Sequence, residues 1–442
     1  MSDRRNNPVV RWFYDLFRVW KREIWFSFHD EGVIIFFLVL CLVYPVLYAL
    51  IYNPETAHDV AVVVVDEDRS PDSRQFARAL DATPEVCVVQ YASSIEEARR
   101  ALNDKQCYGI IRFAGGYGRT IHRGEQAHVE VYCDMGLMFR YKQILIAVTN
   151  VQQAFNSQLL HQRLSVVPVN ISPGTINNEQ VALGNTGMGL ASAILPAIFI
   201  LVLQQSMLLG ICMLHGGSRE RRLHNQGVDP LEIPAGVAAS ILGKSLCYWM
   251  IYIIPTVYTL VIAPKFFDFP QVGDLRSILV LALPFLLASS FMGQAMKIFV
   301  NDRESTFIAL VFTSVIFVFL SGISWPRCSM SPLWLIVGNF IPSTWAVNAY
   351  VQMQSGGATL EQQSTAYFML WVLTGVMFVL AYVVERFICR RRYRRMRHYA
   401  KRDPLALIRE EYRRQAIDIL PERINQADFG VPAGLTEAPS DD

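Results

Sequence analysis

The sequence is short of charged residues. Of its 442 residues only 18% are charged, against about 25% in average soluble domains, which argues against an ordinary cytosolic enzyme. The formal net charge of +2 gives no support for nucleic-acid binding, which usually needs a strongly basic surface. Intrinsic disorder is excluded as well, because 52% of the residues are hydrophobic and a disordered chain needs low hydrophobicity.

Groups for acid–base or metal chemistry are also missing from the apolar runs. All eight histidines fall outside the runs that we predict to be membrane spans, and no H-E-x-x-H pattern occurs. Gly243-Lys244-Ser245 lacks the first glycine of a phosphate loop, because Ala238 occupies that position. The runs contain no Asp or Glu except Glu385 at one end, whereas proton-coupled transporters usually carry such residues inside their spans. We therefore predict no catalytic residue, no metal ligand and no cofactor on this chain.

The eight cysteines are too few for a disulfide scaffold. Three of them lie in apolar runs and are typical of small buried side chains. Cys87, Cys107 and Cys133 lie in the polar part of the chain, where they could form one disulfide or none.

The apolar residues are concentrated in six runs of the length that crosses a bilayer, which is about 20 residues. The predicted spans are Val33–Tyr52, Met188–Leu214, Val237–Ala263, Ile278–Ile298, Thr306–Ile323 and Ala366–Glu385. The apolar stretch Trp325–Gln354 is broken by three prolines, so we predict two short half-helices that enter one leaflet. The predicted fold class is a polytopic α-helical membrane protein with six transmembrane helices, an outer re-entrant hairpin and an inserted α+β extracytoplasmic domain.

Basic residues set the predicted orientation. Arg and Lys gather before the first span, after the second, between the fourth and fifth, and after the last, and such residues favour the cytoplasmic side. We therefore expect a cell (inner) membrane protein with both termini in the cytoplasm. The expected domains are a cytoplasmic amphipathic helix in 1–32, the first span in 33–52, an extracytoplasmic domain in 53–187, five spans with a hairpin near 325–354 in 188–387, and a basic then acidic tail in 388–442.

The N-terminal helix and the outside domain have their own patterns. Over residues 10–28, apolar side chains recur at steps of three and four, which predicts an amphipathic helix that is either a membrane anchor or a receiver of force. Residues 60–164 alternate strand-like and helix-like segments. Gly115-Gly116-Tyr117-Gly118 is predicted to be a turn that does not open a helix, and Asn170-Ile171-Ser172 matches a glycosylation acceptor.

Several motifs resemble the type-2 (ABC-2) family of ABC transporter permeases, in particular its drug-exporter-like bacterial members. Ser321-Gly322-Ile323, Trp325-Pro326, Ser331-Pro332 and Ile341-Pro342-Ser343-Thr344 are similar to the family's outer re-entrant hairpin. Leu242-Gly243-Lys244 resembles the start of its third span. The run from Val62 to Ser70 resembles its outside domain. The resemblance covers about residues 10–387.

The resemblance implies a permease that pairs with a second copy or a paralogue and docks cytoplasmic ATPase subunits, which would hold the ATP. It places coupling to the ATPase in the N-terminal helix and in the loop His215–Ile233, with Arg219, Glu220, Arg221 and Arg222 as candidates. Of the family's Glu-x-Glu-x-Gly-Thr pattern only Glu220 matches, so a plain topogenic loop is the alternative. The hairpin residues are Gly322, Pro326, Pro332 and Pro342.

The same resemblance bears on cargo and partners. The small number of charges in the spans favours a hydrophobic or amphiphilic cargo over an ion, and the resemblance implies that it is moved out of the cytoplasm or inner leaflet. A periplasmic adaptor and an outer-membrane channel are further expected partners. The alternative function is a non-transporting membrane scaffold or receptor-like protein that presents its extracytoplasmic domain to a partner.

Overall fold

A computed structural model describes residues 8–52, 57–164, 184, 189–224, 229, 231–233 and 235–402. These residues form two compact units, a helical unit (8–52, 184 and 191–402) and an α/β unit (57–164 with 189–190). The glycosylation acceptor, most of the linker before the second span and residues 403–442 of the tail lie outside the described residues. All eight cysteines are free thiols, so the structure forms none of the disulfides that the sequence left open.

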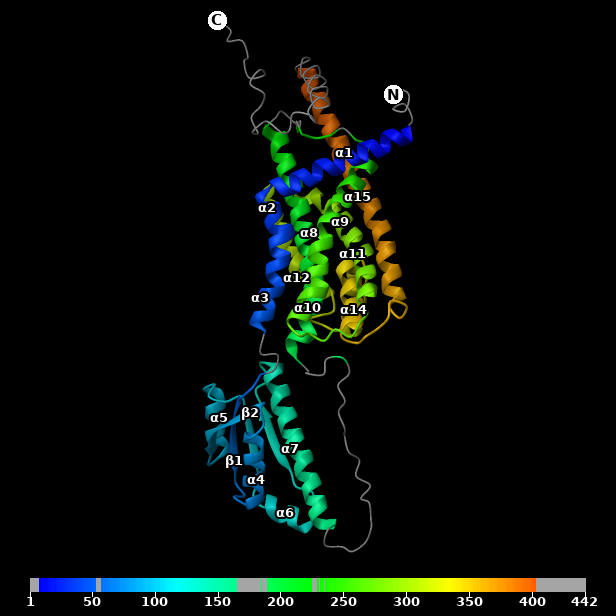
Figure 1. The fold of residues 1–442 in the computed structure, drawn as a ribbon. Helices are drawn as coiled ribbons and strands as arrows, with labels where there is room; N and C mark the ends of the chain where they lie inside the picture. The colour runs from blue at the N-terminus through cyan, green and yellow to red at the C-terminus, as the bar shows by residue number, and fades with distance from the viewer. Residues whose placement is uncertain are drawn as a thin grey trace. The chain divides into compact units, whose positions relative to one another are not determined.

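The helical unit is a bundle with one helix lying across its end (Figure 1). Its elements in chain order are α1 (Pro8–His29), α2 (Glu31–Ile34), the π-helix η2 (Ile35–Val39), α3 (Leu40–Ile51), α8 (Leu190–His224), α9 (Val237–Val257), the π-helix η3 (Tyr258–Ile262), α10 (Ala263–Phe266), α11 (Leu275–Met296), the 3₁₀-helix η4 (Lys297–Phe299), α12 (Arg303–Leu320), the 3₁₀-helix η5 (Arg327–Ser329), α13 (Pro332–Asn339), α14 (Pro342–Gln354) and α15 (Ser364–Arg402).

Six helical stretches in the described part of the chain are long and apolar enough to cross a membrane. They are Glu31–Ile51, Leu190–His224, Val237–Phe266, Leu275–Phe299, Arg303–Leu320 and Ser364–Arg391. Each contains most of one predicted span, so the prediction of six spans is confirmed by length and composition. Helix α8 continues past Leu214 to His224 as one helix, so His215 and His224 lie on the same helix as the second span, beyond the apolar run predicted to cross the membrane.

The spans differ in how far the protein itself covers them. In the most apolar stretch of α8, 83% of the residues are buried, whereas the corresponding value is 18% for α12. The main core brings α3, α8, α9, α11 and α14 together around large side chains such as Phe37, Phe199, Tyr252 and Tyr350. Thus α8 is the central helix of the unit and α12 lies at its periphery.

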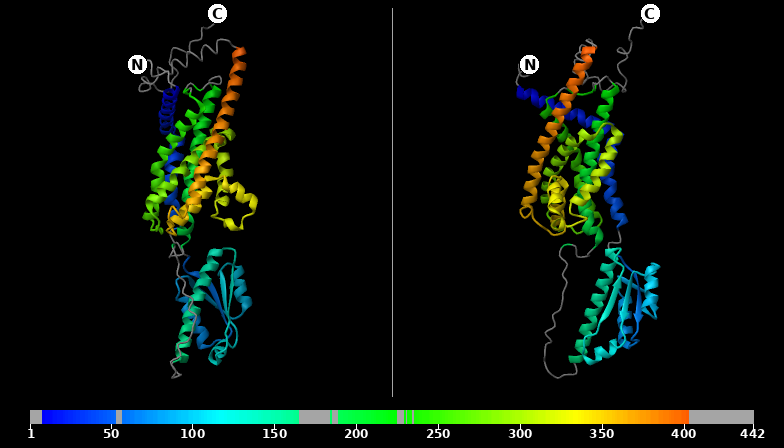
Figure 2. Two further views of the ribbon diagram at one scale, coloured as in Figure 1. Left: turned by 90° about the vertical axis from the view of Figure 1, so that its right-hand side faces the viewer. Right: turned by 180° about the vertical axis from the view of Figure 1, so that it is seen from behind.

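Two short helices follow α12, as the prolines predicted. Pro332 and Pro342 each occupy the first turn of a helix, α13 and α14 respectively, where a missing backbone N–H leaves no hydrogen bond unmade. Figure 2 (left) shows the yellow segment that contains α13 standing out from the side of the bundle. Helix α14 instead packs into the bundle against α11 and α15.

The α/β unit contains a four-stranded sheet with helices on both faces. Its elements are β1 (Val60–Asp66), α4 (Pro71–Asp81), β2 (Val86–Ala92), α5 (Ile95–Asn103), β3 (Gly109–Phe113), α6 (Tyr117–Arg123), β4 (Val129–Cys133) and α7 (Met138–Leu164). The strand order is β2-β1-β3-β4, with β1 parallel to both neighbours and β4 antiparallel to β3. Since strands and helices alternate along the chain, this is an α/β arrangement and differs from the α+β arrangement that we predicted.

Each face of the sheet has its own core. Residues of α4, α6 and α7 pack on one face around Val62, Val64 and Phe113, and α5 packs on the other face around Val63 and Val65. The run Val62–Val65 is therefore buried on both sides, which explains its unbroken β-branched sequence.

The turn predicted at Gly115–Gly118 does open a helix, α6, so that prediction is wrong. The carboxylate of Asp68 accepts hydrogen bonds from the backbone N–H groups of Gly116 (2.7 Å) and Gly118 (2.9 Å). Burial alone would raise the pKa of Asp68, but hydrogen bonds from Ser70, Gly118 and Gly116 hold it below its usual value. This carboxylate satisfies amides at the start of α6, which the local sequence leaves uncapped.

Candidate functional site

Helix α1 lies across the end of the bundle and packs on α9 (Figure 1). Its buried face consists of Val19, Glu23 and Ser27, at steps of four residues. Most of the apolar face that the sequence predicts is exposed, including Phe13 (61%) and Phe17 (57%). The helix therefore turns a partly polar face to the protein and leaves an aromatic face uncovered.

The contact between α1 and α9 contains a buried hydrogen bond. The hydroxyl of Tyr248 in α9 donates to the carboxylate of Glu23 in α1, and both side chains are buried. Tyr248 also packs edge-on against Phe37 at the start of the first span, with ring centroids 5.8 Å apart. The bond joins α1 to a span far away in sequence, and the sequence carries no local signal for it.

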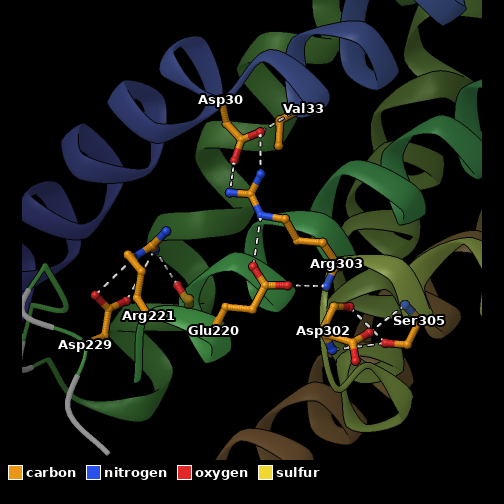
Figure 3. Close-up of polar contacts among 9 residues, drawn as sticks. Asp30, Val33, Glu220, Arg221, Asp229, Asp302, Arg303 and Ser305 are labelled. Atoms are coloured by element: carbon orange, nitrogen blue, oxygen red, sulfur yellow. Dashed lines mark hydrogen bonds and ion pairs between the residues drawn. The ribbon is translucent and has the colours of Figure 1, made fainter. Parts of the chain in front are cut away.

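The junction between α1 and the first span is held by Asp30. This residue caps α2, with its carboxylate accepting from the N–H of Val33 at 3.4 Å. The same carboxylate receives the guanidinium of Arg303, the first residue of α12, at 2.6 Å from Nη2 to Oδ2 and 3.4 Å from Nη1 to Oδ1 (Figure 3). The turn from α1 into the membrane is thus tied to the start of α12.

Glu220 of α8 completes this contact from the other side of Arg303 (Figure 3). Its Oε1 accepts the backbone N–H of Arg303 at 2.8 Å, and its Oε2 lies 3.5 Å from the Arg303 Nε. We call Asp30, Glu220 and Arg303 the Arg303 cluster. One cation here joins three elements, namely the α1–α2 turn, the end of α8 and the start of α12.

Close approach of the backbones makes the Arg303 cluster possible. A Cβ atom added to Gly216 in α8 would lie 2.9 Å from the backbone N of Arg303 and equally close to Asp302. Asp302 caps α12 and forms a capping box with Ser305. Hydrogen bonds from the Ser305 backbone and side chain hold the pKa of Asp302 below its usual value. The turn before α12 is therefore well ordered where it meets α8.

A second group of contacts joins α1 to the connection after α8. Asp229 is 2% exposed and accepts from Arg221 at 3.3 and 3.4 Å, and Arg22 of α1 lies 3.6 Å from it. Both guanidinium groups also lie over the ring of Phe26, each 4.9 Å from its centroid. We call Arg22, Phe26, Arg221 and Asp229 the Asp229 cluster.

The structure describes all four predicted coupling residues, Arg219, Glu220, Arg221 and Arg222. They lie on the last turns of α8, not in an irregular loop, because the predicted loop His215–Ile233 is helical as far as His224. Arg219 donates to the carbonyl of Val300 at 3.2 Å, and Arg222 lies 3.2 Å from Glu232. Arg219 and Glu220 thus contact residues just before and at the start of α12, whereas Arg221 and Arg222 contact the connection after α8. The next helix that the structure describes, α9, begins at Val237.

A buried ion pair lies at the same end of the bundle. Lys297 of η4 contacts the carboxylate of Glu385 in α15, and the two residues are 3% and 9% exposed. In the sequence, each residue is an isolated charge near the end of a predicted span, and no pattern indicates that the two are in contact. Breaking such a pair leaves an uncompensated buried charge, so α11 and α15 are expected to move together.

The predicted hairpin residues lie at the opposite end of α12. Gly322 has φ +92° and makes the turn after α12, and Pro326 precedes η5. The hairpin is fixed to α12 by Asn348 of α14, whose Nδ2 donates to the carbonyl of Ser321 at 3.2 Å. Arg327 in turn donates to Asn339 at 2.5 Å. The four hairpin residues thus shape the turns but make no polar site among themselves.

Taken together, the contacts make a mechanical junction. The two clusters join α1, α8, α12 and the α8–α9 connection through ion pairs and backbone hydrogen bonds. Such a junction can transmit a displacement of α1 or of the α8–α9 connection to α12.

Comparison with known proteins places the chain in a family. The family model described as "ABC-2 family transporter protein" matches residues 32–383, which is most of the chain. No curated protein and no solved structure matches it. The matched region contains four of the six apolar spans in full, most of the first and the last, and the Arg303 cluster except Asp30. A permease of this family implies an ATPase partner in an ABC transporter. The chain belongs to the ABC-2 family of transporter proteins, as a multi-pass membrane permease of an ABC transporter.

Proposed function

We propose that this permease exports a hydrophobic or amphiphilic cargo from the cytoplasm or the inner leaflet. The energy comes from ATP on a separate subunit, and the chain itself is not an enzyme and holds no cofactor. Support for the cargo class comes from the spans, in which the described carboxylates are few and sit near the ends, as Glu385 does. A path with so little charge favours apolar surfaces over ions.

The observation that carries the proposal is the Arg303 cluster. In the proposed orientation both termini lie in the cytoplasm of a cell with an inner membrane, so α1 and the end of α8 face the ATPase. The ATPase pushes on α1 and on the α8–α9 connection. Arg303 then passes the displacement to α12, because it contacts Asp30 and Glu220 at once.

The rest of the assembly follows from the same orientation. The α/β unit lies outside the cytoplasm, where a periplasmic adaptor and an outer-membrane channel are its proposed partners. The hairpin of α13 and α14 enters the outer leaflet. A second permease copy, or a paralogue, completes the path for the cargo, with the peripheral helix α12 near the shared interface.

The test is purification of the full chain with its ATPase from native membranes, followed by reconstitution. ATP hydrolysis and uptake of an amphiphilic fluorescent dye into inverted proteoliposomes are measured together. Arg303→Ala should retain ATP hydrolysis and lose most dye transport, so that more ATP is used per dye molecule. Glu304→Gln changes the exposed neighbouring residue in the same helical turn and is the matched control.

Two results would contradict the proposal. Isolation of the chain without any ATPase, with efflux unchanged after its deletion, would favour the scaffold alternative. Normal coupling in Arg303→Ala would leave an exporter but remove the Arg303 cluster from its mechanism.

A further inference from the structure

The α/β unit exposes its large apolar side chains mostly in one place. Among residues 57–159, whose side chains are described, seven large apolar side chains are exposed, and five of them lie between positions 132 and 145. These five are Tyr132, Met135, Leu137, Met138 and Leu145, with exposed fractions from 41% to 72%. Contiguous exposed apolar side chains mark sites of interaction with proteins or membranes.

The pairing of the strands fixes where these side chains lie within the unit. Val62 near the start of β1 pairs with Gly109, and Gly109 pairs with Cys133 at the end of β4. The turn from β4 into α7 therefore lies at the end of the sheet where β1 begins. Helix α7 starts at this end as well, since a Cβ atom on Gly109 would lie 2.8 Å from the Ile144 side chain.

The turn itself is held in place by polar contacts. The N–H of Asp134 donates to the carbonyl of Tyr108 at 2.9 Å, and its carboxylate receives Lys105 at 2.7 Å. The guanidinium of Arg140 lies 3.7 Å from the centroid of the Tyr108 ring. We call residues 134–138 the Met135 turn. It presents its apolar side chains outward because its base is fixed to the sheet.

A short stretch of chain connects the first span to this end of the sheet. Strand β1 begins at Val60, and the apolar span that contains α3 ends at Ile51. From Tyr52 to Val60 the chain advances eight residues (60 minus 52), which extend to at most about 29 Å. The beginning of β1 is thus tethered within that distance of the point where the span ends.

Charge near the turn favours an apolar partner over a strongly charged one. Lys105 and Asp134 form an ion pair, and Asp104, Arg140 and Lys142 add charges of both signs. Without an excess of one sign, electrostatic attraction to an acidic or basic surface is weak, and the apolar side chains decide the contact.

From these observations we propose that the Met135 turn inserts Met135, Leu137 and Met138 into the surface of the bilayer that α3 crosses. The partner is the lipid interface, in which apolar side chains reach about 5–10 Å into the headgroup and acyl boundary. The proposal depends on α3 being a span and not on export, so it can fail while the proposed function stands.

The experiment uses the full chain, one copy per nanodisc, in phosphatidylcholine. The non-buried cysteines Cys87, Cys133, Cys328 and Cys389 are replaced by serine, and an environment-sensitive fluorophore is attached at Leu137→Cys. The matched control carries the label at Glu125→Cys, an exposed position just before β4, whose first residue pairs with Phe113 at the other end of the sheet. The buried thiol of Cys107 must stay unreactive, which shows that the unit is folded.

Lipids with brominated acyl chains should lower the emission at position 137 by about twofold, because the label then lies at the acyl boundary. The label at 125 should be unaffected. Met135→Ser with Met138→Ser should weaken the quenching at 137, and added salt should not. A label at 137 that is as unquenched as the label at 125, with Cys107 protected, would overturn the proposal. Shielding of position 137 only in discs with two copies would overturn it too, in favour of contact between copies.

Discussion

Arg303 donates through both of its terminal nitrogens to the carboxylate of Asp30, which lies 273 residues earlier in the chain. Asp30 is also the N-cap of α2. The same carboxylate therefore caps the helix that follows α1 and accepts hydrogen bonds from the first residue of α12. The side chains are 13% exposed for Asp30 and 39% for Arg303. Solvent therefore weakens the attraction, and we assign the pair a role in position more than in stability.

Exchange of the two charges between positions 30 and 303 tests whether the ion pair itself is needed for transport. Arg303→Asp alone places three carboxylates together and should abolish dye transport while ATP hydrolysis persists. The double variant Asp30→Arg, Arg303→Asp restores one attraction, so it should recover part of the transport. The measurement is dye uptake per ATP hydrolysed in the unchanged protein, the single variant and the double variant. If the double variant recovers no transport, Arg303 does not act through its ion pair with Asp30.

The bond between Tyr248 and Glu23 should stabilise the position of α1. Tyr248→Phe removes the hydroxyl and leaves a buried carboxylate without this donor, which costs about 1–3 kcal/mol. The thermal unfolding midpoint of the detergent-solubilised chain should fall accordingly. Tyr14→Phe is the control, because Tyr14 lies on the exposed side of α1, the helix that contains Glu23, and its side chain is 54% exposed. Equal midpoints for the two variants would contradict the prediction.

Gly216 should not tolerate a side chain. In Gly216→Ala the new methyl group would lie 2.9 Å from backbone atoms of Asp302 and Arg303, and backbone cannot move aside as a flexible side chain can. Overpacking of this kind costs about 1–3 kcal/mol. Gly375→Ala in α15 meets no atom within 4 Å and should instead stabilise the helix by about 0.5–1 kcal/mol. Thermal unfolding of both variants tests the contrast, and a similar loss in both would refute it.

Acid should destabilise the α/β unit through Glu130. Hydrogen bonds from Tyr132 (2.8 Å) and Arg112 (2.9 Å) lower the pKa of this carboxyl below its ordinary value of 4.5. Its contribution is therefore complete above that ordinary value and is lost as the pH falls through the lowered folded value. Hydrogen exchange of β3 and β4, corrected for its intrinsic pH dependence, should rise below pH 4.5.

Two variants test whether Glu130 causes the faster exchange of β3 and β4 in acid. Glu130→Gln should remove part of the pH dependence of exchange in β3 and β4, since glutamine does not titrate. Glu125→Gln, at an exposed position before β4, should leave the dependence as it is. An unchanged profile in Glu130→Gln would assign the acid effect to other carboxylates.

The spans could be predicted from the sequence because span length follows from bilayer thickness and apolar composition alone. The alternation of strand and helix predicted over residues 60–164 is also present in the structure, where it includes β4 (Val129–Cys133) and the helix α5 (Ile95–Asn103). Ser94 accepts the N–H of Glu97 at 3.3 Å, so this helix begins at a cap that can be read locally.

The parts that could not be predicted depend on partners distant in sequence. Helix α6 begins where Asp68, about 50 residues earlier, receives two amides, and no local pattern indicates it. The pairs of Glu23 with Tyr248 and of Lys297 with Glu385 are 225 and 88 residues apart. For α1, the periodic apolar residues predicted the helix correctly but not the face that packs on the protein.

Helix α12 is bound to the protein mainly at its two ends. At one end are Asp30 and Glu220, and at the other Asn348 donates to Ser321 and Thr344 to Leu320. Between these ends, the side chains of Ile308, Val311, Phe312 and Val315 are exposed. The middle of α12 therefore has few packing contacts with the bundle that would have to break if the helix moved. An 18-residue helix is a rigid rod of about 27 Å. In the proposed mechanism, a tilt imposed at Arg303 would therefore move the hairpin at the far end of the rod. Substitutions in the middle of α12 should then reduce transport less than substitutions at either end.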